Sequence, residues 1–154
     1  MNKRKLFLIL AAVFSCISTF IPYFVVDCDG IVNGVEVSGS SALMLIKNAS
    51  GIAMLITAAL IIVTALFVKQ KAGFVISAFL NVACSCWGLF VIADAKVYPG
   101  MDLDVLRRLD FSFSSMEAMV ITDVLRGPGF FFVVVSVILI LVTAFLYYIQ
   151  REEQ

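Results

Sequence analysis

Residues 130–149 read FFFVVVSVILILVTAFLYYI, an apolar segment of 20 residues that contains no charge. At about 1.5 Å of rise per residue, a helix of this length covers roughly 30 Å, the thickness of a bilayer's hydrocarbon core. Uncharged segments of similar length span residues 6–26, 50–68 and 72–93. None of them has the polar face of a helix in a soluble protein. We therefore predict an all-α membrane protein, a four-transmembrane-helix bundle that forms one domain over residues 1–154.

The bulk composition supports this class and excludes others. The chain is 62% hydrophobic and only 14% charged, and its net charge is zero, so nothing indicates nucleic-acid binding. Lys3-Arg4-Lys5 before an apolar run resembles a signal peptide, and Cys16 lies in a poor lipoprotein cleavage box. The run continues to Val26, however, well beyond a signal core of about 7–15 residues. An uncleaved first span is therefore the better interpretation.

Basic residues near the span ends predict the orientation. Six lie close together on one side of the predicted membrane: Lys3, Arg4, Lys5, Lys69, Lys71 and Arg151. This side should face the cytoplasm, which places both termini inside a cell membrane and the loops 27–49 and 94–129 outside. Nine acidic and five basic residues in these loops give the outer side a net charge of about −4. Such a surface is either simply solvated or a docking surface for cations or basic partners.

The first outer loop predicts a β-hairpin. Asn33-Gly34 stands between Gly30-Ile31-Val32 and Val35-Glu36-Val37, and Asn-Gly between β-branched runs favours a two-residue type I′ turn. Asn33, Gly34 and Glu36 are candidate partner-binding residues. Residues 41–46 are expected to form a short interfacial helix that leads into the second span.

The second outer loop predicts two short helices. Residues 102–109 carry acids first and arginines last, which suits the helix dipole. Ser114-Ser115-Met116-Glu117 fits a capping box, and the apolar residues behind it repeat at helical spacing. These apolar faces would cover the mouth of the bundle, lie in the membrane interface or bind a partner. The faces include Met116, Met119, Val120 and Val124, together with Phe111 and Phe113. Of these, Phe111, Phe113, Met116 and Met119 are the candidate partner-binding residues.

The spans lack the side chains that membrane enzymes and pumps use. They hold no charge, and the chain has no histidine, which removes most zinc sites, His-based acid–base catalysis and a proton relay across the bilayer. Gly-rich phosphate loops and nucleophile elbows are absent as well. We predict no catalytic residues, no metal and no cofactor, and hence a protein that is not an enzyme.

A mild polar stripe runs along the third span. Ser77, Asn81 and Ser85 recur every four residues, and Ser136 and Thr143 of the last span are placed to face them. A stripe of this kind typically packs helices together, with interhelical hydrogen bonds worth about 0.6–2 kcal/mol. The alternative is the lining of a narrow polar pore or a path for lipid headgroups.

The four cysteines suggest a redox function only weakly. Cys84 and Cys86 point to opposite sides of a helix, because two residues turn it by about 200°. Cys16 is expected to be a small packing residue. Cys28 alone lies outside the membrane; it is free, bonded to another protein or buried, and the flanking Asp27 and Asp29 should raise its pKa.

In layout the chain resembles the uncharacterised small four-span membrane proteins of Gram-positive gut bacteria. The resemblance rests on Ile21-Pro22-Tyr23 at the end of the first span, a Val-rich outer loop around residues 35–39, the Lys-Gln-Lys inner turn, and Gly127-Pro128-Gly129-Phe130-Phe131. It implies a cytoplasmic-membrane location and no catalytic activity. Animal claudin-like proteins share the topology, but the Trp and paired Cys of their first loop are missing here.

The leading hypothesis is a non-enzymatic membrane scaffold or accessory subunit. Its outer loops would bind a protein partner or a second copy of the chain, and the bilayer is its other partner. A small transport or channel component that uses Ser77, Asn81 and Ser85 is the first alternative. A membrane thiol-redox protein is the second.

Overall fold

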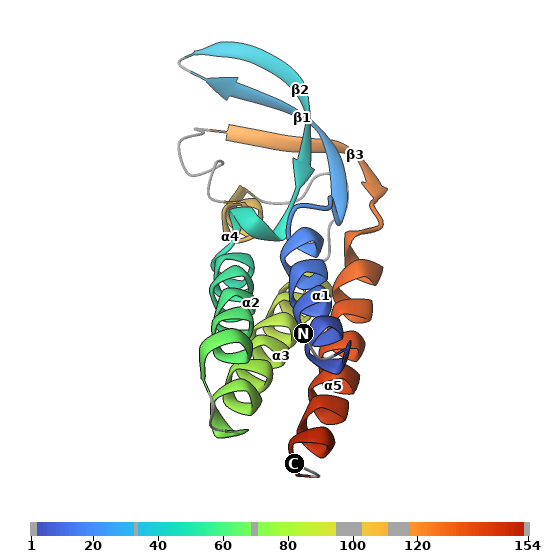
Figure 1. The fold of residues 1–154 in the computed structure, drawn as a ribbon. Coiled ribbons are helices and arrows are strands. Elements are labelled where there is room, and N and C mark those ends of the chain that lie inside the picture. The colour runs from blue at the N-terminus through green and yellow to red at the C-terminus, as the bar shows by residue number, and fades with distance from the viewer. Residues whose placement is uncertain (1–2, 33, 69–70, 95–102, 111–117, 153–154) are drawn as a thin grey trace.

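The computed structural model describes residues 3–32, 34–68, 71–94, 103–110 and 118–152 (Figure 1). The chain is mostly helical, with one small antiparallel sheet. In chain order its elements are α1 (Lys3–Ser18), β1 (Phe24–Val32), β2 (Val35–Leu43), the 3₁₀ helix η1 (Leu45–Lys47), α2 (Ala49–Phe67), α3 (Lys71–Asp94), α4 (Leu103–Leu109), β3 (Ala118–Arg126) and α5 (Gly129–Glu152).

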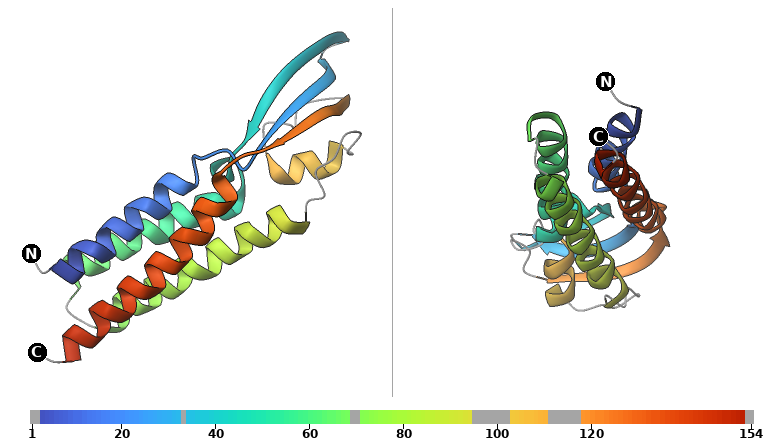
Figure 2. Two further views of the ribbon diagram at one scale, coloured as in Figure 1. Left: turned by 90° about the vertical axis from the view of Figure 1, so that its right-hand side faces the viewer. Right: turned by 60° about the horizontal axis from the view of Figure 1, so that its bottom comes forward.

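The four long helices lie side by side in a bundle. α1 packs against α2 and α5, and α3 packs against the same two helices. Phe14 of α1 stacks on Phe132 of α5, and Phe74 of α3 contacts Tyr147 of α5. The beginning of α1 and the end of α5 both lie at the end of the bundle that is remote from the sheet (Figure 2). Small side chains let the helices approach closely. The buried core of this part consists of Leu8, Ala11, Ala12, Ala58, Ile61, Ala65, Phe74, Ala78, Ile140 and Tyr147.

Three helices are long and apolar enough to cross a bilayer: residues 49–67, 72–91 and 129–149. Their outward side chains are mostly large and apolar, as a lipid-facing surface requires. This combination indicates a multi-pass membrane protein. The prediction of four spans is not confirmed, because α1 does not reach spanning length.

The predicted first span over residues 6–26 is wrong in its second half. α1 ends at Ser18 after 16 residues, about 24 Å of helix. The backbone N–H groups of Thr19, Phe20 and Ile21 each bond to the carbonyl three residues earlier, which tightens the last turn. Pro22 then disfavours helical geometry at Ile21, and β1 begins at Phe24. The apolar run is therefore a short helix followed by a strand.

The predicted hairpin is present and is longer than expected. β1 and β2 pair antiparallel over nine positions, from Phe24 with Leu43 to Val32 with Val35. Gly34 has φ of 76°, a value that glycine adopts without strain. β3 pairs with the other side of β1, so the strand order is β2-β1-β3.

Two of the predicted short helices are wrong. Over residues 41–46, β2 continues to Leu43 and only Leu45–Lys47 are helical. The helix expected behind the capping box is instead strand β3. This segment is rich in β-branched residues, and it pairs with the side of β1 that β2 leaves free. The capping box itself, residues 114–117, lies outside the described residues. The helix predicted over residues 102–109 is confirmed by α4.

Candidate functional site: the outer sheet and its attachment to the bundle

The inner face of the sheet closes over the end of the bundle. Val26, Cys28 and Ile121 are buried on this face. They share an apolar core with Leu106 and Leu109 of α4, which lies between the sheet and the helices (Figure 1). The remaining buried members come from the ends of the first two strands, η1, α2 and α5: Tyr23, Leu43, Leu45, Met54 and Val133. The sheet and the bundle are therefore parts of one packed unit.

The opposite face of the sheet, here called the outer face, is acidic. Strand alternation and the pairing register place four carboxylates on it: Asp27, Asp29, Glu36 and Asp123. Asp27 and Asp123 are direct cross-strand partners, an arrangement of like charges that destabilises a sheet. β1 and β2 contain no Lys or Arg, and Arg126 of β3 pairs with Phe24 on the inner side. Within the three strands, no cation balances this face.

A β-bulge bends the sheet beside the acidic pair. Asp27 pairs with Asp123, but the next residue, Cys28, pairs with Ile121, so Thr122 is the extra residue of β3. The Thr122 hydroxyl donates to the Asp27 carbonyl at 3.0 Å. Bulges of this kind increase the local twist. The irregularity is confined to the β1–β3 side, since β1 and β2 pair without interruption.

The tip of the hairpin extends away from the bundle (Figure 2). Val35, Glu36, Ser38, Gly39 and Ser40 are all exposed. The apolar residue Val35 is 62% exposed. It belongs to the sheet, so contact with lipid does not account for this exposure as it does on the helices. At Gly39, an added Cβ atom would meet no other atom within 4 Å. This part of β2 is therefore open on both faces.

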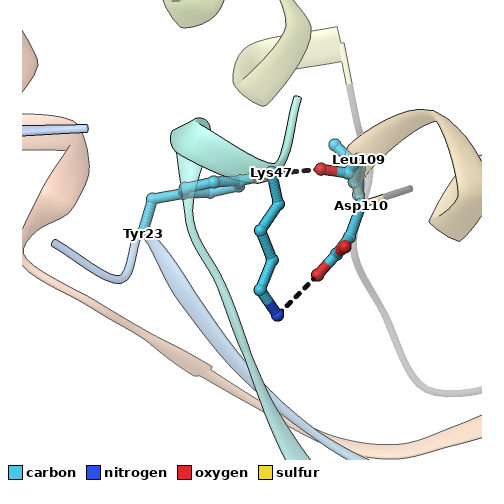
Figure 3. Close-up of polar contacts among 4 residues, drawn as sticks. All are labelled: Tyr23, Lys47, Leu109 and Asp110. Carbon is cyan, nitrogen blue, oxygen red and sulfur yellow. Dashed lines mark hydrogen bonds and ion pairs between the residues drawn. The ribbon is translucent and has the colours of Figure 1, made fainter. Parts of the chain in front are cut away.

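Tyr23, Lys47 and Asp110 fix the sheet and α4 to the bundle (Figure 3). The Tyr23 hydroxyl donates to the Leu109 carbonyl at 3.4 Å, and Lys47 Nζ lies 3.0 Å from the Asp110 carboxylate. The Asp110 side chain is only 1% exposed, whereas that of Lys47 is 39% exposed. Burial, and then the Asp110 charge, raise the pKa of Tyr23 far above its ordinary value, so the hydroxyl stays protonated as a donor.

Asn48 forms a second connection at the start of α2. Its side-chain oxygen accepts from the Ser50 backbone N–H at 3.3 Å, which is an N-cap, and its Nδ2 donates to the Arg108 carbonyl at 2.6 Å. One side chain thus caps α2 and holds the last turn of α4. Together with the Lys47–Asp110 pair it ties two segments that are about 60 residues apart in the sequence.

The third connection joins the two segments that lead into and out of the outer layer. Gly127 N–H donates to the Tyr23 carbonyl and Gly129 N–H to the Pro22 carbonyl, both at 2.9 Å. A Cβ on either glycine would overlap the Pro22 backbone. The close approach explains why this turn needs glycine on both sides of Pro128.

Asn81 is the centre of the polar stripe inside the bundle. Its side chain is fully buried, and its Nδ2 donates to the Met54 carbonyl at 3.0 Å and to Thr57 Oγ1 at 2.9 Å. The Ser15 hydroxyl donates to Asn81 Oδ1 at 3.2 Å. One side chain therefore connects α1, α2 and α3. Its polar atoms are used within the protein.

The other stripe residues bond mainly within their own helices. Ser77 donates to Gly73, Ser85 to Asn81, and Ser136 to Val133, each at 2.8 Å, and all three serines are buried. Thr143 is half-buried and donates to the Leu139 carbonyl, so its bond, like that of Ser136, stays within α5. Ser77 Oγ also accepts from Thr64 of α2, but at 3.5 Å. Asn81 therefore carries the short interhelical hydrogen bonds of this set.

The cysteines are all free. Cys84 is half-buried beside the core under the sheet, and Cys86 is exposed on the outside of α3. The Cys28 side chain is buried on the inner face of the sheet, which was one of the three alternatives that the sequence left open. Burial, followed by the charges of Asp27 and Asp29, raises the pKa of its thiol.

Three of the seven candidate partner residues belong to the part of the chain that the structure describes. Gly34 and Glu36 are exposed at the hairpin tip, and the backbone of Met119 pairs with Gly30 in the sheet. Asn33, Phe111, Phe113 and Met116 lie outside the described residues. Sequence reasoning missed Lys47, Asn48 and Asp110, because nothing local shows that their loops meet. The acidic outer face could have been predicted, because Asp27 and Asp29 are two residues apart and therefore point to the same face of a strand.

No cluster of three or more His, Cys, Asp or Glu side chains suited to a metal ion occurs in the described residues. The geometry defines a class: a multi-pass helical membrane protein that carries a three-stranded sheet at one end of its bundle. No protein-family profile, curated protein sequence or solved structure matched the chain.

Proposed function

We propose that this protein is a non-enzymatic membrane scaffold or accessory subunit whose outer sheet binds a partner protein. The supporting observation is the contrast between the two faces of the sheet. Its inner face is buried on the bundle and held by three polar connections, whereas its outer face and hairpin tip project freely. A bilayer-anchored body that holds a small sheet rigidly in this way suits presentation of a binding surface.

The proposal includes an orientation. Lys3, Lys5 and Lys71 belong to the bundle end away from the sheet, and the sheet end is acidic, which fits the positive-inside rule. We therefore place both termini in the cytoplasm, the sheet outside, and the protein in the cell membrane. With this orientation the outer face meets partners from the extracytoplasmic side.

The polar stripe favours packing over transport. Asn81 is the strongest candidate for a pore lining, yet both of its donor bonds go to α2 and its oxygen accepts from α1. The thiol-redox alternative finds little support either. Cys84 and Cys86 face different surroundings on α3, and the Cys28 side chain is buried on the inner face of the sheet.

Site-specific photocrosslinking in native membranes tests the proposal. A photoreactive residue replaces Ser38 or Asp29 on the outer face, and Ile138 on the lipid-facing side of α5 serves as the matched control. We expect discrete protein adducts from the two sheet positions and lipid adducts from position 138. Protein adducts from position 138 alone would show that the bundle, not the sheet, is the contact surface. The absence of protein adducts from both sheet positions would contradict the scaffold proposal.

A further inference from the structure

β2 is an edge strand without the usual protection. Among the described residues it pairs with β1 alone, over nine consecutive positions and with no bulge. Proteins normally blunt a free edge with Lys, Pro, a bulge or a covering segment, because its open backbone groups otherwise recruit another strand. β2 reads VEVSGSSAL and contains neither Lys nor Pro. Residues 35, 36 and 38–40 at its tip are exposed, and a Cβ at Gly39 would meet no described atom within 4 Å.

The opposite edge of the sheet is protected. β3 carries the bulge at Thr122, contacts α4 and ends in Arg126. The two edges therefore differ in the features that discourage strand addition. This difference singles out β2 as the position where the sheet can grow.

The charge of the outer face selects the chemistry of the added strand. A strand on β2 would place alternate side chains beside Glu36, Ser38 and Ser40, on the face that also holds Asp27, Asp29 and Asp123. No Lys or Arg of the three strands lies on that face. A second copy of this chain would add its own four carboxylates to the same surface. Lys or Arg at alternate positions of a partner would instead be attracted.

We propose that β2 binds an extended, basic segment of a partner protein by strand addition, with its cationic side chains lying over the acidic outer face. This inference rests on the proposed scaffold function and names the chemistry of its partner. Backbone hydrogen bonds to β2 hold the segment, and the carboxylates set its register and its direction of approach.

A peptide-binding experiment on the full-length protein tests this proposal. The protein is placed in nanodiscs of phosphatidylcholine, and the probe is a fluorescent nine-residue peptide of alternating Lys and Thr. We expect saturable binding that weakens as salt is raised, and no binding to empty nanodiscs. A peptide of alternating Glu and Thr should not bind. Equal binding of the acidic peptide would overturn the proposal.

Two N-methylated probes separate strand pairing from simple charge attraction. One carries methyl groups on the amides of the Lys residues and the other on those of the Thr residues, and both keep the full charge. Alternate N–H groups of a strand point to opposite edges. One methylated peptide should therefore bind as the parent does, while the other should lose at least tenfold in affinity. Equal binding of both to the protein would overturn strand addition.

Matched variants locate the site. Asp29→Asn combined with Glu36→Gln should weaken binding of the Lys-Thr peptide at least tenfold and flatten its salt dependence. Asp104→Asn removes an exposed acid on α4, which packs against the inner face and adds nothing to the outer face, and it should change the affinity less than twofold. If the Asp104 variant loses affinity as strongly as the sheet variant, the acidic outer face is not the site.

A further experiment tests whether a second copy of the chain, instead of a basic segment, pairs with β2. Ser38→Cys should remain monomeric under mild oxidation in nanodiscs or membranes; a disulfide dimer that also excludes the peptide would overturn the proposal. The photocrosslinking experiment distinguishes failure of this inference from failure of the proposed scaffold function. Protein adducts at position 38 without any binding of the Lys-Thr peptide would contradict the proposal that β2 binds a basic strand, but would still support the scaffold function.

Discussion

The backbone N–H of Gly127 donates a hydrogen bond to the carbonyl of Tyr23 at 2.9 Å, although the two residues lie far apart in the sequence. Tyr23 stands where α1 gives way to β1, and Gly127 stands where β3 gives way to α5. The contact therefore lies at the junction of the helical bundle and the sheet. It positions both strands and both helices relative to one another.

Gly127→Ala should lower stability by about 1–3 kcal/mol, because a methyl group at this position would overlap the Pro22 carbonyl. The apparent melting temperature in detergent or nanodiscs measures the effect. Gly39→Ala is the matched control, since its new methyl group meets no neighbouring atom. An unchanged melting temperature for the Gly127 variant would show that the junction tolerates a shift.

Asn81→Leu should destabilise the bundle by about 1–2 kcal/mol, because three helices lose their shared hydrogen-bonding side chain. Denaturation with sodium dodecyl sulfate, followed by circular dichroism, gives the free energy. Ser77→Ala serves for comparison, because its hydroxyl bonds mainly to Gly73 in the same helix, and we expect a change below about 0.5 kcal/mol. Equal effects of the two substitutions would argue against a special role for Asn81.

Lys47→Met should cost about 1–3 kcal/mol, because it removes a cation that lies 3.0 Å from a buried carboxylate. Asp104→Asn breaks the exposed pair with Arg107 and should cost well below about 1 kcal/mol. Thermal unfolding of the two variants is the direct comparison. If Lys47→Met unfolds at the temperature of the unsubstituted protein, the Asp110 carboxylate does not depend on this partner.

Cys28 should react slowly with a maleimide at neutral pH. Its raised pKa lowers the thiolate fraction at any pH below that pKa, and burial hinders access, so the rate should rise as the pH increases. Peptide-resolved mass spectrometry follows the labelling in the folded protein. A cysteine introduced by Ser38→Cys on the exposed side of the hairpin should be labelled much faster. Comparable rates at the two sites would mean that the core between the sheet and the bundle does not shield Cys28.

The proposed orientation predicts the outcome of labelling in intact cells. Asn33→Cys at the hairpin turn should react with a membrane-impermeant thiol reagent from outside, and a reporter fused after Gln154 should behave as cytoplasmic. The cationic residues at the end of the bundle away from the sheet are the physical reason. Labelling of position 33 only after the cells are opened would reverse the topology.

The helical part of the fold can be predicted from composition alone, because residues 49–67, 72–91 and 129–149 have no alternative to burial in lipid or protein. The hairpin can also be predicted from a local pattern, since Asn33-Gly34 stands between two β-branched runs and Gly34 has the positive φ that such a turn requires. The second half of the predicted first span is wrong because an uninterrupted apolar run does not distinguish a helix from a buried strand. Only Pro22, inside that run, marks the change.

The attachment of the sheet to the bundle cannot be predicted from local patterns. Lys47 and Asp110, like Asn48 and Arg108, lie about 60 residues apart, and their contacts exist only once α2 and α4 are packed. The helix predicted in place of β3 is wrong for the same reason. Val120 and Val124 fit a helical face, and only the vacant side of β1 decides that they belong to a strand.

Because β1 is the central strand, the sheet can be completed only late in the synthesis of the chain. β2 follows β1 directly, but β3 is the last element before α5, and it is made only after α2, α3 and α4. One side of β1 therefore has no strand to pair with while residues 44–117 are synthesised. Arrival of Ala118–Arg126 fills that side and draws the start of α5 against the end of α1. Completion of the sheet is thus the step that closes the molecule.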